Sequence, residues 1–198
     1  MKYKTILCDP PWKETGGGKI KRGADKHYQV LNHNQIVVLT KEWLSDCVDE
    51  NAHLYLWVTN GHLPDGLKLM EELNFRYITN IAWFKDRIGL GRYFRGMHEL
   101  CLFGTRGNGW KVRTSSNSVR GTIHEKKREH SRKPESFYNV IESRSEGPYL
   151  ELFGRQVRNG WDVKGDETNL FNLNVKQENE SLQDNYVEVA DVGGTEGG

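Results

Sequence analysis

Short apolar runs alternate with stretches of helical periodicity over most of this chain, and that alternation constrains the fold more than any other feature. Such runs predict buried strands, and apolar residues spaced by three or four positions predict helices. Strands that alternate with helices are typical of a doubly wound α/β sheet with mostly parallel strands. The expected strands are 4–8, 53–59, 77–84, 99–104 and 149–153, and the expected helices are 34–48, 65–73 and 134–142.

The length of 198 residues bounds the number of domains. At roughly 150 residues per domain, the chain forms one domain with a tail. The segment 174–198 carries one Lys and six Asp or Glu, contains few apolar residues and ends Gly-Gly-Thr-Glu-Gly-Gly. A segment of this composition buries too little surface to offset the entropy of ordering it. We therefore expect a folded domain over 1–173 and a disordered acidic tail over 174–198.

The formal net charge of +1 hides an uneven distribution. The tail carries a charge of −5, which leaves +6 on residues 1–173. Within that body, the segment 111–133 holds eight Lys or Arg and two Glu among Ser, Thr, Asn and Gly. A segment like this is either a phosphate-binding surface or an exposed, solvated loop, and the charge pattern favours neither.

Hydropathy and cysteine usage exclude several classes of protein. The mean hydropathy is −0.74, and no apolar run approaches the ~18 residues of a membrane-spanning helix. The N-terminus lacks the apolar core of a secretory signal, so we expect a cytoplasmic protein. Cys8, Cys47 and Cys101 are odd in number, lack C-x-x-C spacing and lie in apolar stretches, which predicts reduced, buried thiols and no metal site.

The most informative motif is Asp9-Pro10-Pro11-Trp12, which directly follows the first expected strand. Its chance appearance in a chain of this length is on the order of one in a thousand or less. A strand-ending turn explains the two prolines but does not explain a carboxylate followed by an indole, which we expect to be exposed. Ligands of doubly wound sheets bind beyond the carboxyl ends of the strands, so the motif lies where a site is expected.

The motif fits methylation of the exocyclic amine of a nucleobase. That amine is a poor nucleophile because its lone pair is conjugated into the ring. The Asp9 carboxylate and a backbone carbonyl, accepting hydrogen bonds from the amine, draw it towards tetrahedral geometry and free the lone pair. Pro10 and Pro11 hold the carbonyl in place because their φ angles are fixed. Trp12 would offer a flat face for the base.

With these residues the chain resembles the mRNA adenosine (N6) methyltransferase-like, or MTA-type, family of S-adenosylmethionine-dependent DPPW methyltransferases. The resemblance runs from Tyr3 to about Glu167 and implies a Rossmann-like methyltransferase fold. In that fold the DPPW strand precedes the cofactor-binding strand, and ELFGR at 151–155 is expected to be the last clear strand. The other matching blocks are LYLWVT at 54–59, IAWFK at 81–85, HELCLFGTRGN at 98–108, REHSRKPE at 128–135 and GWDVKGDE at 160–167.

The resemblance implies an acceptor site. Asp9 and Pro10 would contact the target amine, as part of a catalytic motif that includes Pro11 and Trp12. Trp12 and Tyr28 would shape the pocket for the base. The remaining acceptor residues implied by the resemblance are Glu99, which would face the pocket, Lys133, which would lie near the base, and Ser131 beside it.

The resemblance also implies an S-adenosylmethionine site. Asp9 would lie near the ammonium of the cofactor's methionine part and Lys133 near its carboxylate. Phe153 would line the adenine end, and the ribose would be bound by Arg155, Asp166 and Glu167. The eukaryotic pattern has two amides where this chain has Asp166 and Glu167, although a carboxylate also accepts hydrogen bonds from ribose hydroxyls.

Each charged residue also has a purely structural interpretation. Lys133 and Arg155 are also compatible with solvated surface charges, and Glu99 with a cap or with a simple ion pair to a neighbouring cation. Lys85 and His98 carry a weaker signal, because a histidine before a strand is more often structural than an acid–base group. The joint pattern of matches favours the functional interpretation for the first three.

The resemblance predicts transfer of a methyl group from S-adenosylmethionine to the N6 amine of adenine. DNA is favoured as the acceptor over RNA, because the chain is confined to a catalytic domain and its segment Gly-Ala-Asp-Lys-His-Tyr at 23–28 resembles bacterial and phage members. A catalytically inactive, nucleic-acid-binding partner subunit is the alternative from another class. Both the enzyme and the inactive subunit are compatible with assembly into a homodimer or with a separate partner subunit.

Overall fold

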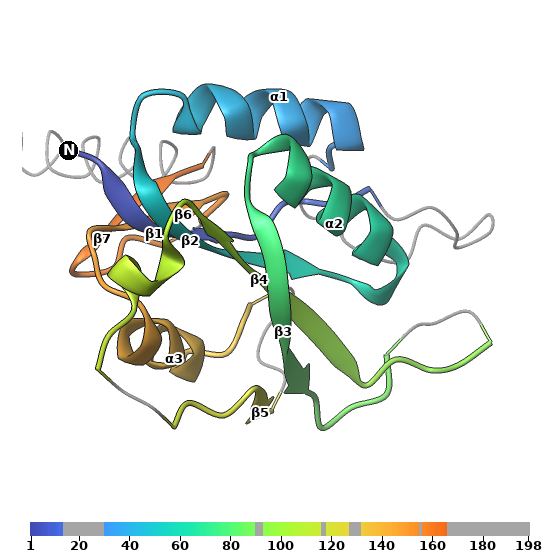
Figure 1. Ribbon diagram of the computed structural model, residues 1–198. Coiled ribbons are helices and arrows are strands. Elements are labelled where there is room, and N and C mark those ends of the chain that lie inside the picture. The colour runs from blue at the N-terminus through green and yellow to red at the C-terminus, as the bar shows by residue number, and fades with distance from the viewer. Residues whose placement is uncertain (14–29, 90–92, 116–117, 127–131, 155, 166–198) are drawn as a thin grey trace, which may run out of the picture.

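The computed structural model describes residues 1–13, 30–89, 93–115, 118–126, 132–154 and 156–165. They form a seven-stranded sheet with helices on both faces (Figure 1). The strands are β1 (Tyr3–Cys8), β2 (Val48–Val58), β3 (Arg76–Phe84), β4 (His98–Arg106), β5 (Thr122–His124), β6 (Tyr149–Leu152) and β7 (Trp161–Lys164). The helices are α1 (His33–Leu44), α2 (Leu63–Glu72) and α3 (Ser136–Arg144), with short 3-10 turns η2 (Asn60–His62) and η3 (Gly109–Val112).

The sheet has the order β5-β3-β4-β2-β1-β6-β7, and only β4 runs against the other strands. Parallel ladders join β1 to β2, β1 to β6, β6 to β7 and β3 to β5. β4 is antiparallel to both β2 and β3. The predicted α/β class with a mostly parallel sheet is therefore confirmed. The carboxyl ends of six strands and the beginning of β4 meet at one edge of the sheet.

Two apolar cores fill the space between the sheet and its helices. α1 and α2 cover one face, where Ile36 and Leu69 belong to the same core cluster as Ile6 of β1. α3 covers the other face, where Phe137 packs in the cluster that contains Leu7. Successive residues of β1 thus enter opposite cores, as expected for a central strand buried on both faces.

The structure corrects several predicted boundaries. The helix predicted for 34–48 ends at Leu44, because Val48 already belongs to β2 and pairs with Tyr3. The predicted helix 134–142 begins at Ser136, with Pro134 before its first turn. The ELFGR strand is not the last one, since β7 follows it. β5 and β7 were not predicted because they have three and four residues and, unlike the equally short β6, contain no more than two apolar residues each.

The structure tests the prediction that the three cysteines are reduced and buried. Cys8 and Cys101 are buried, as predicted, whereas Cys47 is only half-buried, and all three are free. Among the described helices, none is long and apolar enough to cross a membrane. The predicted tail, 174–198, lies outside the described residues, as do 116–117 and 127–131 of the basic segment.

Candidate active site

The Asp-Pro-Pro-Trp motif leaves the carboxyl end of β1 in the middle of the sheet. The Asp9 N–H still donates to the Leu152 carbonyl of β6, 3.3 Å away, so the backbone of Asp9 is held by the neighbouring strand. After Asp9 the chain turns, and the Trp12 N–H donates to the Pro10 carbonyl at 2.9 Å. A carbonyl oxygen has two lone pairs, so the Pro10 oxygen can accept a second hydrogen bond.

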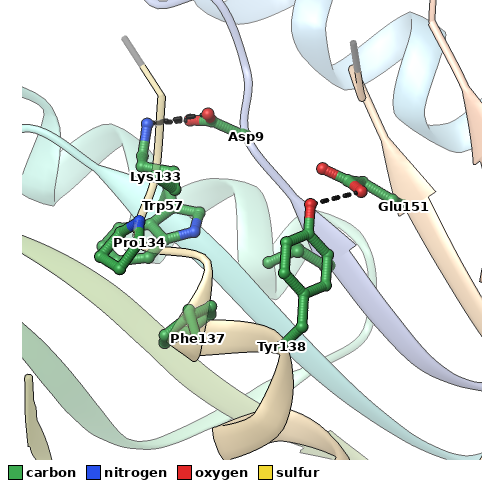
Figure 2. Close-up of a pocket in the computed structure, with 8 residues that line it drawn as sticks. Asp9, Trp57, Lys133, Pro134, Phe137, Tyr138 and Glu151 are labelled. Carbon is green, nitrogen blue, oxygen red and sulfur yellow. Dashed lines mark hydrogen bonds and ion pairs between the residues drawn. The ribbon is translucent and has the colours of Figure 1, made fainter. Parts of the chain in front are cut away.

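Lys133 reaches the motif from the segment that leads into α3. Its Nζ atom lies 2.7 Å from both Oδ1 and Oδ2 of Asp9, so one ammonium bridges the whole carboxylate (Figure 2). The same Nζ atom lies 5.3 Å from the ring centroid of Trp57, near the end of β2. Both charged side chains are partly shielded from solvent, which strengthens their interaction relative to a surface pair.

Glu99 and Lys85 extend this pair into a line of alternating charges. Glu99, at the beginning of β4, places Oε2 at 3.6 Å from Lys133 Nζ. Its other oxygen, Oε1, accepts a hydrogen bond from Lys85, which follows β3. The structure thus brings together Asp9, Lys133 and Glu99, as the sequence predicts, and adds Lys85, whose sequence signal was weak.

A second carboxylate lies beside this network on β6. Glu151 is only 8% exposed, and its Oε2 accepts a hydrogen bond from the Tyr138 hydroxyl of α3 at 2.8 Å. Burial, together with the negative charge of Asp9, raises the pKa of the Glu151 carboxyl to about 7, against the opposing effect of the Tyr138 hydrogen bond. The carboxyl therefore changes its protonation state near neutral pH.

Asp9, Lys133 and Glu151 line one small pocket, whereas Glu99 and Lys85 do not belong to its lining. Figure 2 shows Asp9 and Glu151 on one side of the pocket and α3 on the other. The sequence predicted no role for three of the residues that line it, Tyr138, Trp57 and Glu151. Trp57 belongs to the matching block at 54–59 and Glu151 to the block at 151–155. The residues that line the pocket are Leu7, Asp9, Trp57, Lys133, Pro134, Phe137, Tyr138 and Glu151.

Residues 3–167 of the chain match the MT-A70 family. The chain belongs to the MT-A70 family. Membership implies adenine N6 methyltransferase activity with S-adenosylmethionine as the methyl donor. None of the curated proteins compared with the chain matches it. The resemblance drawn from the sequence is thereby confirmed at the level of the family.

The chemistry of the pocket fits the methyl donor of the MT-A70 family. The methionine part of S-adenosylmethionine carries an ammonium and a carboxylate on one carbon. Asp9 and Lys133 offer the complementary charges side by side, and charge-assisted hydrogen bonds to such groups are strong. Within the described residues, no group of three or more His, Cys, Asp or Glu side chains is placed to hold a metal ion.

Trp12 does not have the exposed indole expected from the sequence. The side chain is 6% exposed, and its Nε1 donates to the Trp57 carbonyl at 2.9 Å. Its ring stacks on His62, with centroids 5.3 Å apart and planes 14° apart. The large apolar ring gains more by joining the core on the α1 and α2 face than by facing water. Trp12 thus anchors the turn of the DPPW motif.

The other residues expected at the site are only partly described. Phe153, after β6, packs its ring against Trp43 with centroids 4.9 Å apart, and it does not line the pocket that contains Asp9. Its place at the cofactor's adenine end remains an expectation from the resemblance. Tyr28, Ser131, Arg155, Asp166 and Glu167 lie outside the described residues.

Glu151 gives the stability of the fold a predictable dependence on pH. Its folded pKa of about 7 lies above the ordinary value of 4.5, so the folded state holds this proton more tightly than the unfolded state does. The associated stabilisation is complete below about pH 4.5 and is lost as the pH rises through 7, up to about 3 kcal/mol. Urea unfolding between pH 5 and pH 8 should show this loss in the wild type and not in Glu151→Gln. Parallel pH profiles of the two proteins would contradict the assignment.

Glu125 holds the segment that carries Lys133. Its carboxylate accepts hydrogen bonds from the Glu135 N–H at 3.2 Å and from the Ser136 hydroxyl at 2.5 Å, at the beginning of α3. Glu125→Ala removes this tertiary cap and is expected to lower the free energy of unfolding by about 0.5–2 kcal/mol. Glu125→Gln retains an acceptor and should recover most of that loss in urea unfolding. Equal stability of all three proteins would show that the cap contributes nothing.

Proposed function

We propose that this chain transfers a methyl group from S-adenosylmethionine to the N6 amine of adenine in DNA. The observation that carries the proposal is the carboxylate of Asp9, held at the carboxyl end of β1 by Lys133 and followed by the carbonyl of Pro10. These groups supply hydrogen-bond acceptors at a fixed place, beside a cation that suits the carboxylate of the methyl donor. Family membership supports the reaction, and the site supports the residues that perform it.

Asp9 and Pro10 act on the amine of the base. A carboxylate has about four acceptor positions, so Asp9 can accept an amine N–H while it remains bound to Lys133. The Trp12 N–H occupies one lone pair of the Pro10 carbonyl oxygen, and the second lone pair is suited to accept the other N–H of the amine. S-adenosylmethionine, when bound, would supply a methyl group on a sulfonium for in-line attack by the nitrogen. The new N–C bond would form as the methyl–sulfur bond breaks, the neutral thioether would leave, and the methylated amine would lose one proton. Most of the rate enhancement then comes from orientation and from electrostatic preorganisation.

The choice of DNA is supported by the resemblance of the segment 23–28 to bacterial and phage members. Adenine in duplex DNA must be flipped out of the stack before its amine can reach a pocket of this kind. RNA adenosine is the rival acceptor within the same chemistry. A competition assay with equal amounts of adenine-containing DNA and RNA and labelled S-adenosylmethionine decides between them. Label in DNA supports the proposal, and label confined to RNA would refute the choice of acceptor.

An inactive, nucleic-acid-binding partner subunit is the alternative function. The intact charge network of Asp9, Lys133 and Glu99 speaks against it, because a scaffold has no need of a preorganised carboxylate. Calorimetry of the isolated chain with S-adenosylmethionine separates the two. Saturable binding supports the enzyme, whereas an absence of binding together with retained affinity for nucleic acid would favour the scaffold.

A further inference from the structure

The connection between β3 and β4 exposes aromatic side chains to solvent. Phe94 is 86% exposed and Tyr93 is fully exposed, and Ile88 and Met97 in the same connection are also exposed. Large apolar side chains of this kind are more often buried, so several exposed ones in one short connection are a candidate binding surface. Figure 1 shows the described parts of this connection, 85–89 and 93–97, extending away from the sheet.

Backbone hydrogen bonds hold both sides of this connection together. The Lys85 N–H donates to the Met97 carbonyl, and the Gly89 N–H donates to the Gly96 carbonyl, each at 2.8 Å. A Cβ atom at Gly89 would lie 3.0 Å from the Gly96 oxygen, so the close approach of the two sides favours glycine there. The antiparallel pairing of β3 and β4 thus continues outward, with Tyr93 and Phe94 beyond its last described hydrogen bond.

The connection begins and ends at the charge network of the candidate active site. Lys85 stands at its start, and Glu99 follows its end in β4, where the two side chains are hydrogen-bonded. A polymer with one residue at Asp9 therefore has to pass close to this connection. The connection is also basic: Arg87 and Arg95 are exposed, and Asp86 is the acidic residue among its described positions.

We infer that the described residues of the β3–β4 connection, 85–89 and 93–97, bind the nucleic-acid strand beside the target adenine. Tyr93 and Phe94 stack on unpaired bases, and Arg87 and Arg95 contact phosphates. Aromatic rings flanked by cations are the combination that binds single-stranded nucleic acid, because every base has a stacking face and every linkage a negative charge. The inference rests on the proposed function and specifies how its substrate is held. The same residue types also occur in protein interfaces, so the test includes that outcome.

The test compares Tyr93→Ala/Phe94→Ala with Trp110→Ala in the full chain. Trp110 is 74% exposed in η3, which follows the carboxyl end of β4 at the opposite edge of the sheet, and serves as the matched control. Binding of a fluorescent single-stranded oligonucleotide with one central adenine is followed by anisotropy. The double variant is expected to bind more weakly by at least about 5- to 150-fold, which is the range for the loss of a single base–aromatic stack, and the control to bind as the wild type does.

Kinetics with the same oligonucleotide localise the effect. The double variant should raise the KM for the oligonucleotide and leave the KM for S-adenosylmethionine unchanged. Tyr93→Phe, which keeps a ring, should bind like the wild type. Arg87→Ala/Arg95→Ala should bind more weakly at low salt and show a shallower salt dependence, because fewer phosphates are neutralised.

Four results would overturn the inference. They are wild-type affinity in the double variant, an equal loss in Trp110→Ala, no oligonucleotide binding by the wild type, and loss of a dimer by light scattering with oligonucleotide affinity unchanged. The last result would identify the surface as a protein interface. The proposed function is judged separately. A wild-type chain that binds the oligonucleotide through Tyr93 and Phe94 but transfers no methyl group would refute the proposed function, and the inferred binding surface would remain valid.

Discussion

Asp9→Ala is expected to reduce the rate of methyl transfer by about 10²–10³ while the fold is retained. The substitution removes the acceptor that polarises the target amine, and loss of one preorganised group of this kind has an effect of that size. It also leaves Lys133 without its bidentate partner, so the ammonium is no longer held at the carboxyl end of β1. Single-turnover rates at saturating S-adenosylmethionine measure the effect.

The control for Asp9→Ala is Asp46→Ala, which removes an exposed carboxylate. Asp46 precedes the amino end of β2 and so lies at the opposite edge of the sheet. Its turnover should match that of the wild type. Circular dichroism and thermal unfolding of both variants establish that they are folded. Wild-type turnover in a folded Asp9→Ala protein would contradict the assignment of Asp9 to the reaction.

Lys133→Ala is expected to weaken the binding of S-adenosylmethionine by about 1.5–3 kcal/mol, or roughly 10- to 150-fold in Kd. The ammonium that neutralises Asp9 and approaches Glu99 is the cation best placed to bind the carboxylate of the methyl donor. Lys68→Ala, which removes a largely exposed lysine of α2, is the control and should bind as the wild type does. Calorimetry that gives equal Kd values for Lys133→Ala and the wild type would remove Lys133 from the cofactor site.

The sequence predicted well those features of the site that depend on neighbouring residues in the chain, such as the position of Asp9. Two successive prolines cannot donate to the ladder of a central strand, so the position of Asp9 at the carboxyl end of β1 followed from the motif itself. The placement of Lys133 beside Asp9 depends on a contact across 124 positions, and Glu99 joins them through Lys133. Only the resemblance to a family predicted this arrangement. Without that resemblance, Lys133 would have been interpreted as a solvated surface charge and Glu99 as a capping residue or the partner of a neighbouring cation.

The features that sequence did not predict depend on packing between distant segments. Trp12 is buried because His62 and the Trp57 carbonyl, some fifty residues later, provide a stacking partner and an acceptor. The raised pKa of Glu151 depends on its burial and on the charge of Asp9 across the parallel β1 and β6 pair. Neither property leaves a periodic signal in the sequence.

The central claim is that this chain methylates the N6 amine of adenine. It is tested most directly by incubating the purified protein with adenine-containing DNA and S-adenosylmethionine that carries an isotopically labelled methyl group, followed by nucleoside mass spectrometry. The account predicts labelled N6-methyldeoxyadenosine with the wild type and a strongly reduced amount with Asp9→Ala. Label on another base, or an equal yield from the two folded proteins, would contradict it.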